Sequence, residues 1–196
     1  MQTIILASQS PRRKQLLEWA EIPFDVVVKS TAETYPADMP LHQVPIHIAL
    51  EKAKAVKAYL LETGNLIFAQ RPILAADTIV VLDKLVIGKP ANREEAISTL
   101  QSLSGKTHRV ITGVTILYGA KEYKFSDTTE VSFHELDSTD ITRYVDKYKP
   151  YDKAGAYAIQ EWIGVTGIQS IKGDFYNVMG LPVSLVVKAL QQLNTV

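Results

Sequence analysis

Two adjacent arginines, Arg12 and Arg13, stand near the start of the chain in the stretch LASQSPRRKQLLEWA, residues 6–20. The Ser10-Pro11 pair before them is typical of a helix start, because serine can cap a helix and proline suits its first position. That end of a helix carries a partial positive charge, so two cationic side chains are unfavourable there on their own. The pattern therefore indicates that a negative charge lies near the two arginines.

A bound phosphate group would explain the two arginines. Backbone N–H groups at a helix start attract anions, and the guanidinium groups of Arg12 and Arg13 can hold phosphate oxygens bidentately, beside Ser8 in the preceding loop. The motif has no glycine and is not a Walker loop. The alternative is that both arginines reach into solvent and pair with Glu18 or Glu21.

Asp77 is the second residue that could do chemistry. It stands in the apolar run ILAADTIVVLD, residues 73–83. A carboxylate in a buried strand is costly unless it is paired, hydrogen-bonded or bound to a metal. Carboxylates in such places are common metal ligands and general bases. The alternative is that Asp77 only caps a bend, with Thr78 as its partner.

Three further charged residues are unremarkable when each is considered alone. Glu33 lies in a polar, proline-containing loop, Lys52 lies on a helix with other lysines, and Lys89 precedes a proline. Each is typical of a solvated surface position.

The segment YDKAGAYAIQ, residues 151–160, combines small residues with polar ones. Small residues allow a flat ligand to approach the backbone, and Asp152, Lys153 and Gln160 offer polar groups that could contact its edges. A nucleobase pocket has this character, and so does the start of an ordinary strand. The residues alone leave both interpretations open.

The bulk properties limit what class of protein this is. The chain has 196 residues, and its 21 Lys and Arg balance its 21 Asp and Glu, so no long-range attraction to nucleic acid or anionic membrane is expected. Cysteine is absent, which excludes disulfides and Cys-ligated metals, and the four histidines show no metal-ligand spacing. No apolar run is long enough to span a bilayer, and MQTIILASQS lacks a basic region before its apolar run. We expect a cytoplasmic protein.

Hydrophobic patterns and turn residues predict the elements that must position these side chains. Strands are predicted at 3–8, 24–30, 73–83 and 85–90, a strand hairpin at 108–119 and 121–136, and a strand at the end of 150–160; helices are predicted at 10–20, 44–64, 92–105, 138–148 and 181–193. On the second helix, Ile48, Ala55 and Tyr59 fall on one stripe, and Asn92 and Glu95 have capping-box spacing.

Alternating helices and strands with one hairpin favour an α/β fold with a mixed central sheet and flanking helices. No internal repeat, low-complexity tract or linker is present. We therefore expect residues 1–196 to form a single domain, with two lobes around a cleft.

Six motifs occur in order and nearly end to end: LASQSPRRKQLL, ALEKA, AADTIVV, GKP, DKAGAYAIQ and YNVMGLPV. Together they resemble the Maf family of septum-formation proteins, which are nucleoside triphosphate pyrophosphatases. The resemblance implies an inosine-triphosphatase-like fold, usually in a homodimer. It also implies hydrolysis between the α- and β-phosphates with a divalent cation, Mg²⁺ or Mn²⁺. The form of the DKAGAYAIQ motif is similar to the branch that acts on dTTP and UTP.

The resemblance also implies roles for the residues at matching positions. Ser8, Arg12 and Arg13 match the triphosphate clamp, Lys52 and Lys89 match further phosphate ligands, Glu33 matches a metal-binding or water-orienting carboxylate, Asp77 matches the general base and a metal ligand, and Asp152, Lys153 and Gln160 match the pocket near the base. Glu33, Asp77 and Lys89 are thus the expected catalytic residues.

The chain departs from the family pattern at two positions beside the expected base pocket. Lys149 stands where an acidic residue often precedes the proline, and Glu161 stands where glycine often follows Gln160. Base selectivity is therefore less firmly implied than the reaction. Two alternative functions are a nucleotide-binding regulator of septum formation without catalysis, and a purine hydrolase acting on inosine triphosphate.

Overall fold

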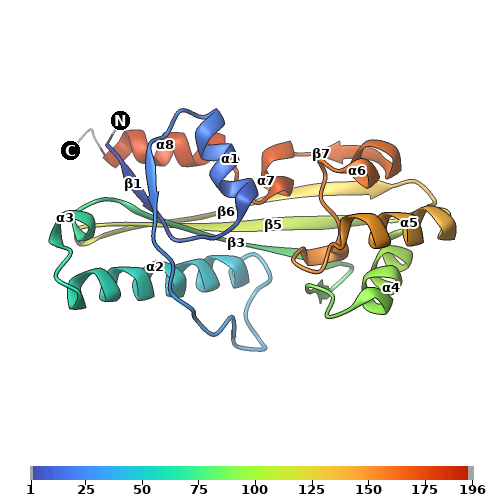
Figure 1. The fold of residues 1–196 in the computed structure, drawn as a ribbon, viewed down its shortest axis with the longest axis horizontal. Coiled ribbons are helices and arrows are strands. Elements are labelled where there is room, and N and C mark those ends of the chain that lie inside the picture. Colours follow the sequence, from blue (N-terminus) through green and yellow to red (C-terminus); the bar gives the residue numbers. More distant parts are fainter. Residues whose placement is uncertain (1, 194–196) are drawn as a thin grey trace. The chain divides into compact units, whose positions relative to one another are not determined.

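The structure is a computed structural model that describes residues 2–193. Its helices and strands follow one another along the chain as drawn in Figure 1. In chain order they are β1 (Ile4–Leu6), α1 (Pro11–Trp19), β2 (Phe24–Val26), α2 (Val44–Glu62), α3 (Leu66–Ala69), β3 (Ile73–Leu82), β4 (Leu85–Ile87), α4 (Arg93–Leu103), β5 (Thr107–Tyr118), β6 (Lys121–Phe133), α5 (Ser138–Tyr148), the 3₁₀ turn η1 (Ala154–Ala156), α6 (Trp162–Gly167), β7 (Ile168–Lys172), α7 (Phe175–Met179) and α8 (Val183–Leu193).

Seven strands form one sheet in the order β2-β1-β3-β5-β6-β7, with β4 paired to β3. Strand β1 is parallel to both of its neighbours, whereas β4 runs antiparallel to β3 and β7 antiparallel to β6. The predicted mixed α/β sheet with flanking helices is therefore confirmed.

The described residues form two compact units. The first comprises the chain up to Asp77, residues Thr112–Asp127 and the chain from Gly180 onward; the second comprises Thr78–Ile111 and Thr128–Met179. Strands β3, β5 and β6 contribute residues to both units.

The core of the first unit lies between α2 and the strands. Ile5 and Ile73 from the strands pack with Ala53 and Val56 from α2, and all four are buried. Helix α2 lies on one side of β1 and β3, with α1 and α8 on the other side (Figure 1). Strand β5 approaches the start of α2 so closely that a Cβ on Gly113 would lie 2.2 Å from the Ile46 nitrogen.

The stripe of Ile48, Ala55 and Tyr59 is only partly the buried face of α2. Ile48 is buried, but Tyr59 is 37% exposed and Ala55 is only half-buried. The helix buries the neighbouring stripe, which contains Ala49, Ala53, Val56 and Leu60. In this Ala-rich helix, small apolar residues occur on both stripes, so the pattern alone does not distinguish them.

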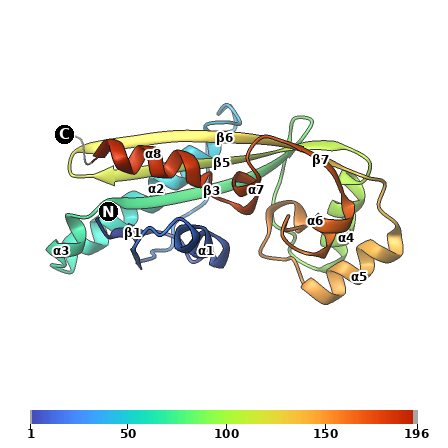
Figure 2. The same cartoon turned by 90° about the horizontal axis from the view of Figure 1, so that it is seen from above.

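The second unit has its own core and two packed helices. Val80, Val110 and Val131 form a buried cluster in it. Helices α4 and α5 lie side by side (Figure 2), and the Arg93 Nε atom of α4 is 2.5 Å from an Asp146 oxygen of α5.

The predicted cap of α4 is confirmed. The Asn92 side chain accepts a hydrogen bond from the Glu95 nitrogen at 2.9 Å, and the Glu95 carboxylate accepts one from the Ala91 nitrogen at 2.8 Å. The first bond satisfies a backbone donor that the first turn of a helix leaves without a partner, and the second fixes the chain just before the cap residue.

Two local predictions need correction. Ser10 stands at the N-cap position of α1, but its side chain makes no capping hydrogen bond. The predicted strand at the end of 150–160 does not form: η1 occupies Ala154–Ala156, and the residues that follow belong to no strand. Gly155 and Ala156 have φ angles of 73° and 58°, which turn the chain out of an extended path.

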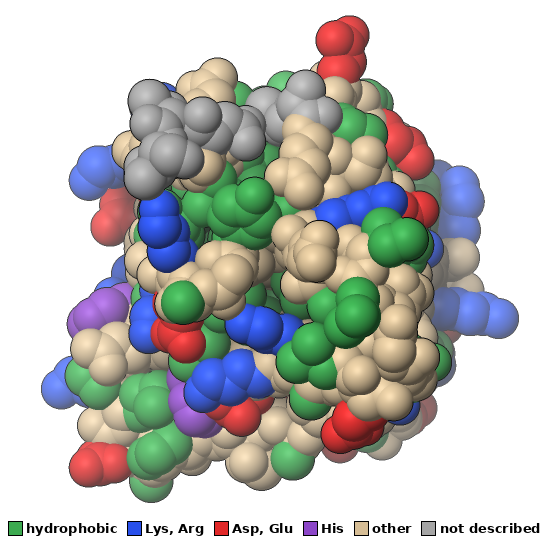
Figure 3. All heavy atoms as spheres, turned by 90° about the vertical axis from the view of Figure 1, so that its left-hand side faces the viewer, with side chains coloured by type: hydrophobic (Ala, Val, Ile, Leu, Met, Phe, Trp, Pro, Cys, Tyr) green, Lys and Arg blue, Asp and Glu red, His purple; other side chains and the backbone are tan. Residues whose placement is uncertain are grey.

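Charges are mixed on the surface. On the face drawn in Figure 3, Lys and Arg side chains lie among Asp and Glu side chains rather than in one continuous field. None of the helices within residues 2–193 combines the length and the apolar character needed to cross a bilayer.

Candidate active site

Lys52 joins two carboxylates in the first unit. Its Nζ atom, on α2, lies 2.7 Å from Oδ1 of Asp77 on β3 and 2.7 Å from Oε1 of Glu33 in the loop before α2. The Asp77 side chain is only 12% exposed, whereas that of Glu33 is 46% exposed. The buried carboxylate predicted from the sequence is therefore paired with a cation, as its burial requires.

Arg13 is directed into the protein. Its Nη1 atom donates to the Ser8 hydroxyl at 3.1 Å, and its Nε atom donates to the Gly180 carbonyl at 2.8 Å. The Ser8 hydroxyl also accepts a hydrogen bond from the Ser10 nitrogen at 3.2 Å, which fixes the loop between β1 and α1. The alternative in which Arg13 only reaches into solvent is therefore wrong.

The carboxylates beside Lys52 act electrostatically on Arg13. Burial lowers the pKa of Arg13, and the neighbouring Arg12 lowers it further, while the negative charges of Asp77 and Glu33 raise it. Arginine stays protonated in proteins, so Arg13 keeps its positive charge. Arg13 thus lies within the electrostatic influence of the carboxylates that Lys52 joins, beside its neighbour Arg12.

The register of the parallel strands explains this proximity. Strand β1 pairs with β3 so that Leu6 lies opposite Leu74. Because parallel strands advance together, the loop that begins after Leu6 runs level with the stretch of β3 that leads to Asp77. The carboxyl ends of parallel strands in α/β sheets are a common place for ligands.

The predicted metal ligands, Asp77 and Glu33, suit a divalent cation that phosphate groups of the substrate would also coordinate. Among residues 2–193, no group of three or more His, Cys, Asp or Glu side chains is arranged to hold a metal ion. Asp77 and Glu33 nevertheless lie close together, since each places one oxygen on the Lys52 ammonium group. Mg²⁺ is usually bound by one or two carboxylates, with waters and substrate phosphates completing its shell.

The other predicted residues belong to the second unit. Lys89 is exposed in the loop after β4, next to Gly88, whose carbonyl accepts a hydrogen bond from the Gly155 nitrogen at 3.2 Å. Asp152 and Gln160 are also exposed, as residues that contact a ligand can be.

Lys153 is buried and paired within its own unit. Its Nζ atom lies 2.8 Å from an Asp152 oxygen and 3.5 Å from a Glu161 oxygen. Glu161 also accepts a hydrogen bond from the hydroxyl of Tyr144, a fully buried residue of α5. The ammonium group of Lys153 is thus neutralised by neighbouring carboxylates.

Sequence reasoning missed three of these partners, Gly180, Tyr144 and Glu161. Gly180 lies in the YNVMGLPV motif, which could have drawn attention to it. Tyr144 lies in an amphipathic helix, where a buried tyrosine is ordinary. In the sequence, Glu161 stands out only as a departure from the family pattern.

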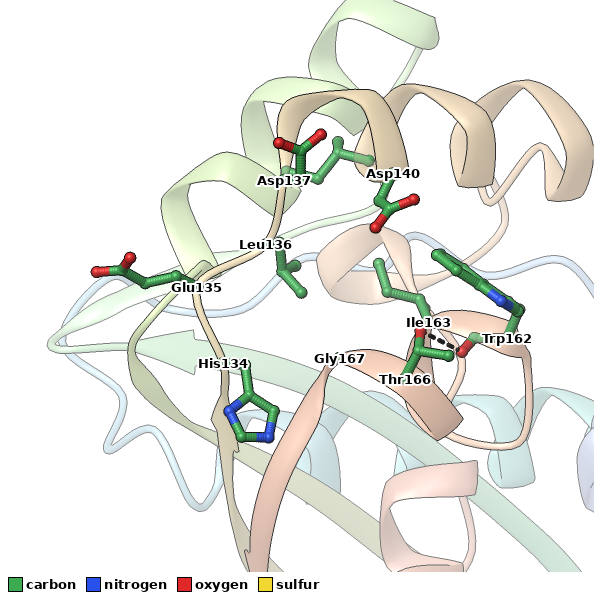
Figure 4. A pocket seen from close by; sticks show the side chains of 10 residues that line it. His134, Glu135, Leu136, Asp137, Asp140, Trp162, Ile163, Thr166 and Gly167 are labelled. Carbon is green, nitrogen blue, oxygen red and sulfur yellow. Dashed lines mark hydrogen bonds between the residues drawn. The ribbon is translucent and has the colours of Figure 1, made fainter.

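Two hollows in the described structure are lined by other residues. A small one of about 80 Å³ in the second unit is lined by His134, Glu135, Leu136, Asp137, Asp140, Ile141, Trp162, Ile163, Thr166 and Gly167. Figure 4 shows that Glu135 points away from it, and its volume is far below that of nucleotide pockets. An open groove of about 540 Å³ in the first unit is lined by Thr31, Ala32, Thr34, His47, Glu51, Lys54, Ala55 and Ala58, which flank Glu33 and Lys52 in the sequence.

Comparisons with known proteins agree with the motifs. A family model described as "Maf-like protein" matches residues 3–193. A protein of Cytophaga hutchinsonii named "dTTP/UTP pyrophosphatase" is 51% identical over 190 residues, which are 97% of this chain and 84% of that protein. Proteins with the same name are 46% identical in Phocaeicola vulgatus, over 97% of this chain and 95% of that protein, and 44% identical in Bacillus cereus, over 99% and 97%.

A solved structure of the Staphylococcus aureus Ham1 protein aligns with 67% of this chain and 72% of its own at a TM-score of 0.45 and 12% identity, which is too low to establish a common fold. The inosine-triphosphatase-like fold therefore stays a prediction. The family match spans nearly the whole chain, and the clustered Ser8, Arg13, Lys52 and Asp77 lie in three of the motifs that carry the resemblance. The chain belongs to the family of Maf-like proteins.

Proposed function

We propose that this protein is a nucleoside triphosphate pyrophosphatase that hydrolyses dTTP and UTP to the monophosphate and pyrophosphate. Family membership and the name shared by the relatives support the proposal. The observation that carries it is the position of Lys52, which lies 2.7 Å from both Asp77 and Glu33. A cationic clamp beside a buried carboxylate suits hydrolysis of a polyphosphate.

In the proposed reaction, a water oxygen attacks the α-phosphorus and its proton passes to Asp77. The bond between the α-phosphorus and the oxygen that bridges to the β-phosphorus breaks, and pyrophosphate leaves with that oxygen. Arg12, Arg13 and Lys52 stabilise the negative charge that develops on the leaving group, with Ser8 as a further phosphate contact. Lys52 also holds Asp77 in place.

The divalent cation is part of the proposal. Asp77 and Glu33 would hold Mg²⁺ or Mn²⁺ together with phosphate oxygens of the substrate. When bound, such an ion neutralises phosphate charge and orients the reacting groups. Lys89 is proposed, on the resemblance alone, as an additional phosphate ligand, and Asp152, Lys153 and Gln160 as the pocket near the base.

A product analysis tests the proposal. The purified protein is incubated with Mg²⁺ or Mn²⁺ and with dTTP, UTP, CTP, GTP and inosine triphosphate in turn, and the products are separated by chromatography. We expect monophosphate and pyrophosphate in equal amounts, fastest from dTTP and UTP. In ¹⁸O-labelled water the label should enter the monophosphate, because attack occurs at the α-phosphorus.

Other outcomes favour other functions. Release of inorganic phosphate with a diphosphate product would contradict the assigned bond. Binding of dTTP without any product over hours would favour the non-catalytic regulator, and a preference for inosine triphosphate would favour the purine hydrolase.

A homodimer and a cytoplasmic location also remain proposals. The dimer rests on the family resemblance, and the location is consistent with the absence of cysteine. Light scattering of the purified protein in solution should give twice the mass of the 21.8 kDa chain. A monomer that retains full activity would contradict the dimer.

A further inference from the structure

The segment Lys153–Gln160 has an irregular backbone that must be held by side chains. Gly155 and Ala156 both adopt positive φ angles, which are unfavourable for alanine. The residues after them pair with no strand, so no sheet ladder fixes their direction. Whatever this segment presents to a ligand therefore depends on contacts made elsewhere along it.

The Tyr144 hydroxyl anchors the segment at two points. It accepts a hydrogen bond from the Ala158 nitrogen at 3.3 Å and donates one to the Glu161 carboxylate. These two anchors lie on either side of Gln160, whose side chain is exposed while Ile159 is buried. The backbone around Gln160 is thus held by a tyrosine of helix α5.

Glu161 links the same anchor to Lys153. Although it stands at the N-cap position of α6, its side chain makes no capping hydrogen bond there. Its carboxylate instead contacts the Tyr144 hydroxyl and lies 3.5 Å from the Lys153 ammonium group. The Glu161 carboxylate therefore connects the end of the segment to Lys153 at its start. Lys153 also contacts Asp152 at 2.8 Å.

We propose that Tyr144 and Glu161 are positioning residues that fix Lys153 and Gln160 and thereby set the discrimination between nucleobases. This inference rests on the proposed function, since it assumes that the segment contacts the base. It also assigns a role to the glutamate that replaces the glycine often found after Gln160 in the family. Lys153 mainly stabilises the segment in this arrangement, because neighbouring carboxylates already balance its charge.

The test compares Glu161→Ala, Glu161→Gln and Tyr144→Phe with the unaltered protein. Tyr144→Phe keeps the ring, which stacks on Tyr148 at 4.9 Å between centroids, and removes only the hydroxyl. Glu130→Gln is the matched control, since Glu130 makes an exposed contact of 3.4 Å with Lys172 in the same unit.

Steady-state rates are measured with UTP, dTTP and GTP, and thermal unfolding is followed in parallel. For Glu161→Ala and Tyr144→Phe we expect KM for UTP and dTTP to rise about tenfold, equivalent to about 1.4 kcal/mol. We expect kcat to stay within about threefold and the preference for UTP over GTP to fall about tenfold. Glu161→Gln, which can still accept from Tyr144, should recover part of the loss, and the Tyr144→Phe/Glu161→Gln double variant should be less than additive.

Unchanged base preference in both Glu161→Ala and Tyr144→Phe would overturn the inference. So would a parallel fall of kcat and thermal stability without a change of preference, because that is the result of a purely structural role. Calorimetric binding of a non-hydrolysable UTP analogue separates the two proposals. If the unaltered protein hydrolyses nothing but binds the analogue, and the variants bind it about tenfold more weakly, only the hydrolysis is refuted.

Discussion

Replacing Asp77 with asparagine is the most direct test of the proposed chemistry. In the structure, Oδ1 of Asp77 lies 2.7 Å from the Lys52 ammonium group, and its side chain is 12% exposed. Asparagine has nearly the same shape, and its amide oxygen can still accept a hydrogen bond from Lys52. The substitution therefore removes the charge and the proton-accepting ability while it keeps the packing.

The expected effects on stability and on turnover differ in size. The ammonium group keeps Glu33 as a partner at 2.7 Å, so no buried cation is left unpaired. The free energy of unfolding should fall by about 1–2 kcal/mol, as for the weakening of one charged hydrogen bond. Loss of a general base should lower kcat by about 10²- to 10⁴-fold, which is about 2.7–5.5 kcal/mol in the barrier. Affinity for a non-hydrolysable dTTP analogue, measured without divalent cation, should be kept, because a negative charge beside the phosphate site is removed.

The assay measures kcat with saturating dTTP, the dissociation constant of a non-hydrolysable dTTP analogue, and unfolding in urea. Asp25→Asn is a matched control in the same unit, because Asp25 is not one of the predicted site residues and forms its own ion pair, with Arg71 at 2.5 Å. The control should leave kcat and affinity within about twofold of the unaltered values.

Two results would refute the reasoning. If Asp77→Asn keeps kcat within about threefold, Asp77 is not the proton acceptor. If turnover and the affinity measured without divalent cation are lost together while the protein stays folded, Asp77 serves direct substrate binding, and another group must accept the proton.

The remaining predictions concern a phosphate ligand, pH and packing. Arg13→Ala should raise KM and lower kcat for dTTP together, since Arg13 is proposed to contact the substrate both in its bound form and in the transition state; unchanged steady-state kinetics would show that this residue has only a structural role. Burial lowers the pKa of His108 from 6.5 to about 4. Between these values the unfolded chain takes up a proton that the folded chain does not, so the free energy of unfolding should fall by about 3 kcal/mol from about pH 7 to about pH 4. Urea unfolding across that range should show a smaller fall in His108→Phe. Gly113→Ala should cost about 3 kcal/mol or more, because the new Cβ would lie 2.2 Å from the Ile46 nitrogen; Gly88→Ala, where nothing lies within 4 Å, should cost less than about 1 kcal/mol by the same measurement.

Elements whose signals lie within a few residues of each other could be predicted. The helix of Arg93–Leu103 begins where Asn92 and Glu95 place it, and the hairpin turns at Gly119 as expected. Ser10 shows the limit even here. It stands at the predicted cap position, yet its side chain makes no capping hydrogen bond. Its backbone nitrogen donates a hydrogen bond to the Ser8 hydroxyl.

Elements that depend on distant partners could not be predicted. A strand is predicted at the end of residues 150–160, because small apolar residues are common in strands. In the structure, Ala156 to Ile159 are buried but form no strand. They are instead anchored by Tyr144, which precedes them by more than ten residues. No local pattern distinguishes a backbone nitrogen that bonds to a neighbouring strand from one that bonds to a tyrosine hydroxyl.

The sequence by itself determined the class of fold, the family and the types of side chain available for the proposed reaction, because these depend on composition, periodicity and motif order. Only the tertiary structure decided that Lys52 joins Glu33 to Asp77, that Arg13 binds Ser8 and Gly180, and that Glu161 holds Lys153. The physical reason is that charged side chains are assigned partners by chain packing, which brings together residues far apart in the sequence. A list of residue types contains the charges but not their distances.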